Sequence, residues 1–200
     1  EKKKLSICGI VGLDALQDGT ICGGKLPDVD IVGLLELKLK YHHKGDIKVI
    51  YSMADTKHYI PMPEIPGEKD FNPYYMMLKM DINKPLYICN HILCIVNYQQ
   101  DGMTSRVLQS YEECPVSYAM LREAYLEHQE IPCMFAYRQC IHYVSSWIFA
   151  KRQKKKVNSL WRRKLVWMAV IPGVILICGF AGRIGDINDF RRMLFEYIKK

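Results

Sequence analysis

Cys8 is the residue whose neighbours best equip it for chemistry. It opens the run Cys8-Gly9-Ile10-Val11-Gly12, in which a thiol precedes small and apolar residues. A cysteine thiol can act as a nucleophile, and the glycines let a substrate or another backbone approach closely. The same run also suits a buried strand with an inert cysteine, because free cysteine is among the most buried residue types. Under either interpretation we expect Cys8 to begin a central strand or lie within one.

The remaining cysteines give little support to a metal site or a disulfide framework. The eight cysteines lie at positions 8, 22, 89, 94, 114, 133, 140 and 178. The sequence has no Cys-x-x-Cys pair, and no two histidines separated by three to five residues accompany a pair of cysteines; these are the spacings typical of zinc sites. We therefore expect no metal, no cofactor, and reduced thiols in a cytoplasmic protein.

Positive charge is concentrated in one stretch, which we call the basic run. The formal net charge is +7, and residues 151–164 (KRQKKKVNSLWRRK) hold eight basic residues and no acidic one. The remainder of the chain is therefore about neutral. Such a run can bind nucleic acid or an anionic membrane, although it is more often a solvated loop or strand edge. We expect no nucleic-acid partner.

The pattern of apolar and turn residues predicts an α+β layered domain. Helices are expected to begin at Pro27, Pro115 and Asp186. Residues 133–137 and 147–151 are expected to form adjacent antiparallel strands. Further strands are expected at 5–13, 47–52, 74–80, 85–98 and 107–111.

Residues 165–182 are eighteen residues without charge, flanked by basic residues. This length meets the lower limit for a membrane-spanning helix. Pro172 and Gly173 interrupt the stretch, but both residue types occur in spanning helices. The alternative is a strand followed by a turn.

Landmarks from Cys8 to Tyr197 resemble, in order, the amidotransferase domain of glutamine-dependent asparagine synthetases, which are class II glutamine amidotransferases. The opening Cys-Gly-Ile matches the family. So does the block Met134-Phe135-Ala136, which is followed at similar spacing by Phe149-Ala150-Lys151-Arg152. Weaker matches are His43-Lys44-Gly45-Asp46, Asn97-Tyr98, the acidic pair Glu112-Glu113 before a helix, and a closing helix that ends in Glu196-Tyr197-Ile198.

The resemblance implies a four-layer αββα sandwich of the N-terminal-nucleophile type, formed by a single domain over residues 1–200. It implies that the Cys8 thiol attacks the side-chain amide of glutamine, releasing ammonia and then glutamate through a thioester. Lys44, Gly45, Asn97 and Glu113 are the residues it places around the substrate. An ATP-dependent synthetase domain or subunit is the implied partner, and no such domain is visible in this chain.

The sequence departs from the family at three points, so we expect weak or absent activity. Seven residues precede Cys8, whereas the family uses the free amine of a first-residue cysteine as the base. Lys44 replaces an arginine and lacks its two-pronged hydrogen bonding. The Asn-Gly pair of the oxyanion hole falls on Ile92 and Leu93, which carry no side-chain donor, and losing one donor typically costs about 100- to 1000-fold in turnover. A shifted alignment would instead bring Asn90 near.

A second function class also fits the sequence. The chain could be a membrane-anchored structural or assembly subunit, with a soluble head over residues 1–150 and one transmembrane helix at 165–182. The two hypotheses differ in the structure of residues 165–182, which is a strand and turn in the first and a continuous apolar helix in the second.

Overall fold

The structure is a computed structural model that describes residues 6–97, 107–160 and 164–181. Over these residues the chain is a mixed α+β protein, as expected. It divides into two compact units, each with its own hydrophobic core. Unit 1 comprises Glu1–Pro63 and Pro73–Gly102, and unit 2 comprises Glu64–Asn72 and Met103–Lys200. This division is finer than the single domain that the resemblance implies.

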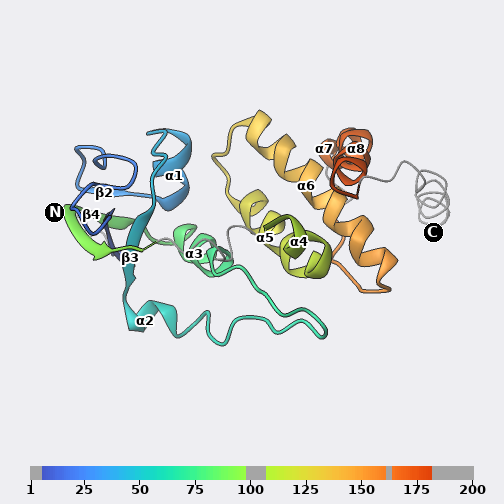
Figure 1. Ribbon diagram of the computed structural model, residues 1–200, viewed down its shortest axis with the longest axis horizontal. Coiled ribbons are helices and arrows are strands. Elements are labelled where there is room, and N and C mark those ends of the chain that lie inside the picture. Colours follow the sequence, from blue (N-terminus) through green and yellow to red (C-terminus); the bar gives the residue numbers. More distant parts are fainter. Residues whose placement is uncertain (1–5, 98–106, 161–163, 182–200) are drawn as a thin grey trace. The chain divides into compact units, whose positions relative to one another are not determined.

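Unit 1 is built on a four-stranded sheet (Figure 1). Its strands are β1 (Gly9–Ala15), β2 (Ile31–Val32), β3 (Ile47–Tyr51) and β4 (Leu86–Ile95), in the order β2-β4-β1-β3. β1 runs antiparallel to β3 and parallel to β4, and β2 runs antiparallel to β4. β1 is therefore a central strand, and Cys8 directly precedes it, which confirms the expected placement to within one residue.

Helices cover one face of this sheet. α1 (Leu34–Leu39) and α3 (Tyr74–Asp81) pack on it, and α2 (Met53–Thr56) is a single turn that follows β3. Val11 and Leu13 of β1 are almost fully buried in the core beneath these helices. Successive side chains of a strand point to opposite faces, so Ile10 of β1 belongs to the other face.

That other face carries an apolar row that crosses all four strands. Strand register pairs Ile31 of β2 with Tyr87 of β4, Tyr87 with Ile10 of β1, and Ile10 with Ile50 of β3. These four residues are 37 to 53% exposed. The sheet of unit 1 thus has one covered face and one apolar face that is open to solvent.

Asp81 fixes the start of α1. Leu34 N and Leu35 N donate hydrogen bonds to its two carboxylate oxygens, at 2.5 and 2.9 Å. The first amides of a helix have no partner within the helix, and a negative charge there is favoured by the helix dipole. Because Asp81 is the last residue of α3, this contact ties the two covering helices together.

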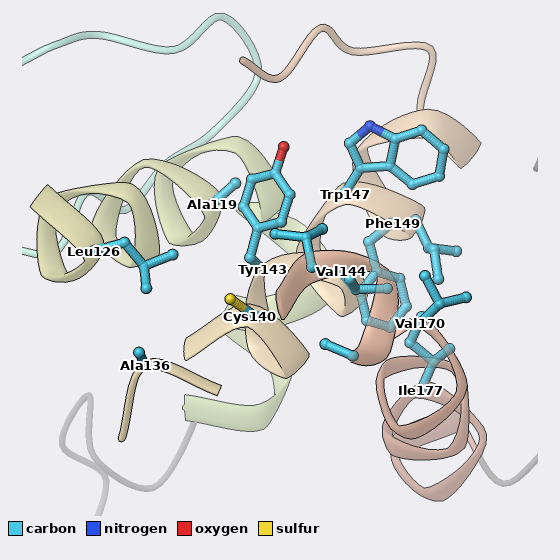
Figure 2. Close-up of a cluster of buried hydrophobic side chains, with 13 residues drawn as sticks. Ala119, Leu126, Ala136, Cys140, Tyr143, Val144, Trp147, Phe149, Val170 and Ile177 are labelled. Carbon is cyan, nitrogen blue, oxygen red and sulfur yellow. The ribbon is translucent and has the colours of Figure 1, made fainter. Parts of the chain in front are cut away.

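The described elements of unit 2 are helices. They are α4 (Val107–Glu113), α5 (Pro115–Glu127), α6 (Cys133–Arg152), α7 (Lys164–Met168) and α8 (Val170–Ala181). α6 contacts all the others (Figure 1). Its buried Tyr143, Val144 and Trp147 form a core with Val170 and Ile177 of α8, and Figure 2 shows these side chains directed into it.

Glu68 fixes a loop from earlier in the chain to the start of α5. Its carboxylate accepts hydrogen bonds from Val116 N and Ser117 N, at 2.9 and 2.8 Å, and from Ser117 Oγ at 2.5 Å. Lys155 Nζ lies 3.1 Å from the same carboxylate, and the Glu68 side chain is only 1% exposed. Pro115 is the first residue of α5, so the carboxylate satisfies the amides that directly follow it.

Several expected strands are helices instead. Residues 133–137 and 147–151 both lie in α6, so the prediction of two antiparallel strands is wrong. Residues 74–80 lie in α3, and residues 107–111 lie in α4. A short apolar run is compatible with either a strand or a helix. Here the runs at 133–137 and 147–151 belong to one long helix, which buries its apolar side. The two runs of α6 carried much of the family resemblance.

Residues 165–182 do not form the continuous helix of the second hypothesis over the part that the structure describes. α7 ends at Met168 and α8 begins at Val170. Among the described residues, no helix has both the length and the apolar character needed to cross a membrane. These residues are also not the strand of the first hypothesis. The helix predicted from Asp186 lies outside the described residues.

Candidate functional site

Cys8 is held inside unit 1 by both its backbone and its thiol. Its amide donates to Pro85 O at 3.0 Å, and its carbonyl accepts from Ser52 N at 2.8 Å. The thiol points to Lys84 O, with Sγ 3.2 Å from that oxygen and 3.6 Å from Pro85 O. Cys8 is 1% exposed. A substrate therefore has no access to the sulfur in this structure.

The electrostatics around Cys8 favour the neutral thiol. Burial raises the pKa of Cys8, and the negative charges of Asp81 and then Asp55 raise it further. Lys84 acts in the opposite sense but is paired with Asp55, with Nζ 2.5 Å from Oδ1. Burial, helped by Cys8 and Asp81, also raises the pKa of Tyr51. Since the thiolate is the nucleophilic form, Cys8 has the character of a structural cysteine.

Three predicted site residues lie at the opposite end of β1 from Cys8. Lys44 is exposed, and Gly45 lies two residues before β3, whose first residue, Ile47, pairs with Leu13 near the end of β1. Asn97 is exposed and follows the end of β4, where Ile95 pairs with Ala15. β1 is seven residues long, so it separates this group from Cys8 by roughly 20 Å.

Gly45 has a packing role at this end of the sheet. A Cβ atom added to Gly45 would come within 2.0 Å of Cys22 O and 2.4 Å of Gly23 Cα. Only glycine permits this close approach of two backbones. A structural need therefore accounts for a residue that the resemblance assigned to the substrate.

Of the remaining predicted groups, one belongs to unit 2 and one already has hydrogen-bond partners. Glu113 is the exposed last residue of α4, in unit 2. Asn90, the alternative oxyanion donor, is held by Leu26, whose amide donates to Asn90 Oδ1 at 2.8 Å and whose carbonyl accepts from Nδ2 at 3.2 Å. The structure thus gathers Lys44, Gly45 and Asn97 at one end of the sheet, and Cys8 is not among them.

A different surface, on unit 2, combines features that suggest binding. Trp167, Met168, Ile171 and Ile175, which we call the apolar stripe, are 43, 66, 73 and 64% exposed. Ile171 and Ile175 are four residues apart and so lie on one side of α8, whereas Trp167 and Met168 belong to the preceding helix, α7. Exposed apolar side chains in such a contiguous set mark interaction sites rather than ordinary surface.

The other side of α7 and α8 explains why the apolar stripe is directed outward. Val166 of α7 is buried in the core that α6 helps to form, and so is Ile177 of α8 (Figure 2). Gly173 lets the helices approach closely, because a Cβ there would lie 2.7 Å from a methyl group of Val144. With this side fixed in the core, the residues of the apolar stripe cannot also turn inward.

The basic run directly precedes the apolar stripe in the chain. Lys151, Lys154, Lys156 and Lys164 are exposed, whereas Lys155 is paired with the buried Glu68. Lys151 also lies over the ring of Trp147 in α6, 5.5 Å from its centroid. Exposed cationic and exposed apolar groups therefore follow one another along the chain of unit 2.

A polar aromatic cluster links α4, α5 and α6. The guanidinium of Arg122 donates to the Tyr111 hydroxyl and, at 3.1 Å, to Gln139 Oε1. The rings of Tyr111 and Tyr118 stack with centroids 4.1 Å apart, and His142 lies 5.9 Å from Tyr111. The hydrogen bonds among its members indicate that this cluster joins the helices.

His142 of this cluster is held in its neutral form. Burial, followed by the positive charges of Arg122 and Arg138, lowers the pKa of His142 to about 4. Its Nδ1 is buried without a hydrogen-bond partner. Among the described residues, no three metal-ligating side chains lie close enough together to hold a metal ion, so this histidine has no such role there.

Comparison of the chain with models of protein families, with curated proteins and with solved structures gives no match. The functional conclusion therefore depends on the residues themselves. Packing among the described residues of unit 2 does not account for the exposure of the apolar stripe and of the lysines in the basic run.

The sequence indicated this surface only in part. The basic run and the uncharged stretch at 165–182 were both visible as adjacent segments. Which apolar side chains are exposed was not visible, because nearly every residue of the stretch is apolar and no periodicity distinguishes one side from the other. The contact of Gly173 with α6 makes that distinction.

Proposed function

We propose that unit 2 binds the surface of anionic membranes, with the apolar stripe inserted among the lipid headgroups and the basic run in contact with their charges. One observation carries this proposal: four apolar residues that are 43 to 73% exposed follow residues 151–164, which include eight basic residues and no acidic residue. Helices that lie in a membrane interface combine an apolar side with lysine and arginine and commonly contain tryptophan. The chain need not span the bilayer to bind in this way.

The expected affinity is modest. Each basic residue near an anionic leaflet contributes about 1 kcal/mol. Burying the exposed part of an isoleucine contributes roughly 1 to 1.5 kcal/mol, since a fully buried side chain is worth about 1.5 to 3 kcal/mol. Because Lys155 is already paired with Glu68, its contribution is smaller than that of the exposed lysines. These terms support reversible attachment that weakens as salt screens the charges.

Vesicle flotation tests this proposal. The full chain is mixed with phosphatidylcholine vesicles made with and without phosphatidylserine, and the floated protein is quantified. We expect flotation only with phosphatidylserine. The double variant Ile171→Ser/Ile175→Ser should bind at least about 10-fold more weakly. Equal flotation of both vesicle types, or an unchanged double variant, would contradict the proposal.

The matched control is Ile50→Ser/Ile95→Ser in unit 1. These isoleucines are 53 and 55% exposed, close to the exposure of those in the apolar stripe, but they lie on strands of the sheet. The control should float like the unaltered chain. An equal loss in both double variants would mean that the loss comes from general surface polarity rather than from the apolar stripe.

A glutaminase of the N-terminal-nucleophile class is the second candidate, and the position of Cys8 directly before a central strand favours it. It requires removal of residues 1–7 and a movement that frees the thiol from Lys84 and Pro85. The αββα sandwich would also need a second sheet. That sheet would pack on the exposed face of the sheet in unit 1, against the apolar row. Glutamine and a synthetase subunit would then be its partners.

An ammonia-release assay tests this second candidate. Glutamine is incubated with the chain that starts at Glu1 and with one that starts at Cys8. We expect no turnover with the first chain, because its Cys8 amine is a peptide nitrogen that donates to Pro85 O. Turnover that appears only when the chain starts at Cys8, and that Cys8→Ala abolishes, would support the hypothesis. Absence of turnover in both chains would contradict it.

A further inference from the structure

Ser159 lies between the two halves of the basic run. Five basic residues precede it within residues 151–156, and three follow it within residues 162–164. Ser159 is exposed, and residues 155–160 contain neither helix nor strand. Protein kinases distinguish substrates largely by charge patterns around the acceptor, and lysines three to five residues before a serine suit a kinase with an acidic substrate groove.

The backbone on both sides of Ser159 is anchored to α6. The hydroxyl of Tyr143 accepts a hydrogen bond from Leu160 N at 3.2 Å and donates one to Asn158 O. Tyr143 itself is fully buried. A group added to Ser159 would therefore remain at the surface of unit 2, five residues before the start of α7, rather than move away on a free chain.

We propose that Ser159 is a phosphorylation site for a kinase that prefers basic substrates, and that its phosphorylation releases unit 2 from anionic membranes. The release rests on the membrane binding proposed above. In the reaction, the Ser159 oxygen attacks the γ-phosphorus of ATP and the bond from that phosphorus to the bridging oxygen breaks. ADP leaves, and the serine proton passes to a base of the kinase. The products are phosphoserine, ADP and a proton.

The size of the effect follows from the charge. Phosphoserine adds about −1.5 to −2 charges at pH 7 and places them among the lysines that face the anionic leaflet. At about 1 kcal/mol per charge, binding should weaken roughly 10- to 30-fold. Ser159→Glu adds one charge and should weaken binding roughly 5-fold. Ser159→Gln is similar in size but neutral and should bind like the unaltered chain.

The test uses the full chain and phosphatidylserine vesicles. The chain is treated with protein kinase C and ATP, the modified residue is identified by mass spectrometry, and vesicle binding is measured for the modified chain and both variants. We expect phosphate on Ser159 and the order of affinities unaltered, Ser159→Gln, Ser159→Glu, phosphorylated, with the first two equal. Circular dichroism of each protein confirms that its helices are unchanged.

The outcomes separate this inference from the proposal on which it rests. If the unaltered chain does not bind phosphatidylserine vesicles, both proposals are overturned. If it binds but phosphorylation and Ser159→Glu leave the affinity unchanged, only the release is overturned. Absence of phosphate at Ser159 after kinase treatment overturns the modification site, whatever the vesicle binding.

Discussion

Replacing Glu68 with glutamine should destabilise unit 2 more than any other single exchange of a carboxylate for an amide among the described residues. The carboxylate is 1% exposed and accepts from three groups at the start of α5, between 2.5 and 2.9 Å, besides facing Lys155 at 3.1 Å. In Glu68→Gln one oxygen becomes an amide group, whose hydrogens would face N–H and ammonium donors. Breaking a buried pair by removing one charge costs about 3 to 5 kcal/mol.

Tryptophan fluorescence during urea unfolding measures this loss in unit 2 alone. The three tryptophans, at positions 147, 161 and 167, all belong to unit 2, and Trp147 is 2% exposed in its core. We expect Glu68→Gln to lower the free energy of unfolding by about 3 kcal/mol or more. The matched control is Glu130→Gln, which alters an exposed carboxylate of unit 2 and should change the free energy of unfolding by less than about 0.5 kcal/mol. Equal losses in the two variants would refute the reasoning.

Three further predictions concern other positions. In the same urea assay, Gly173→Ala should destabilise unit 2 by about 1 to 2 kcal/mol, although alanine is the better helix former, because the new methyl group would lie 2.7 Å from Cγ1 and 2.8 Å from Cβ of Val144; unchanged or increased stability would contradict this. The pKa of His142 is lowered to about 4 in the folded chain, against about 6.5 in the unfolded chain. The folded state therefore resists protonation of His142, so the free energy of unfolding is highest above pH 6.5 and falls as the pH drops toward 4. His142→Leu should remove up to about 3 kcal/mol of this acid sensitivity, and an unchanged pH dependence of unfolding would contradict the assignment. Iodoacetamide should label the exposed Cys133 in the folded chain while the buried Cys8 reacts only in urea, as mass spectrometry of the two peptides would reveal.

The sequence predicted the sheet of unit 1 better than the helices of unit 2. β1, β3 and β4 overlap the strands expected there, because valine and isoleucine between turn residues favour a pleated surface. α5 was also expected, since Pro115 fits the first turn of a helix. In each case a local signal and the tertiary structure agree.

The error at α6 came from dividing one helix into two short apolar runs. Over the whole element, Cys140, Tyr143, Val144 and Trp147 are buried at spacings of three and four residues, which is a helical period. A window of five residues is too short to show that period. A helix was one of two alternatives for residues 165–182, and α8 shows how Pro172 is accommodated: it is the third residue of α8, and proline in the first turn displaces no internal hydrogen bond.

The position of the candidate site could not be derived from sequence alone. Cys8 carries a motif, but its burial depends on Lys84 and Pro85, more than seventy residues later in the chain. Lys44, Gly45 and Asn97 were expected around the same substrate as Cys8, yet the register of β1 puts them at the end far from Cys8. Long-range pairing of this kind has no local signature.

The loop that carries Glu68 also constrains the order in which the protein can fold. Glu64–Asn72 belongs to unit 2 but lies between two segments of unit 1. During synthesis β1 and β3 emerge first, yet β4, which pairs with β1 and β2, emerges only after this loop. Glu68 in turn remains without its amide partners until residues 116 and 117 are made. Domains usually fold one after the other from the N-terminus, and here unit 1 can complete its sheet only after the loop of unit 2 has emerged, so this loop must wait without its partners while unit 1 closes.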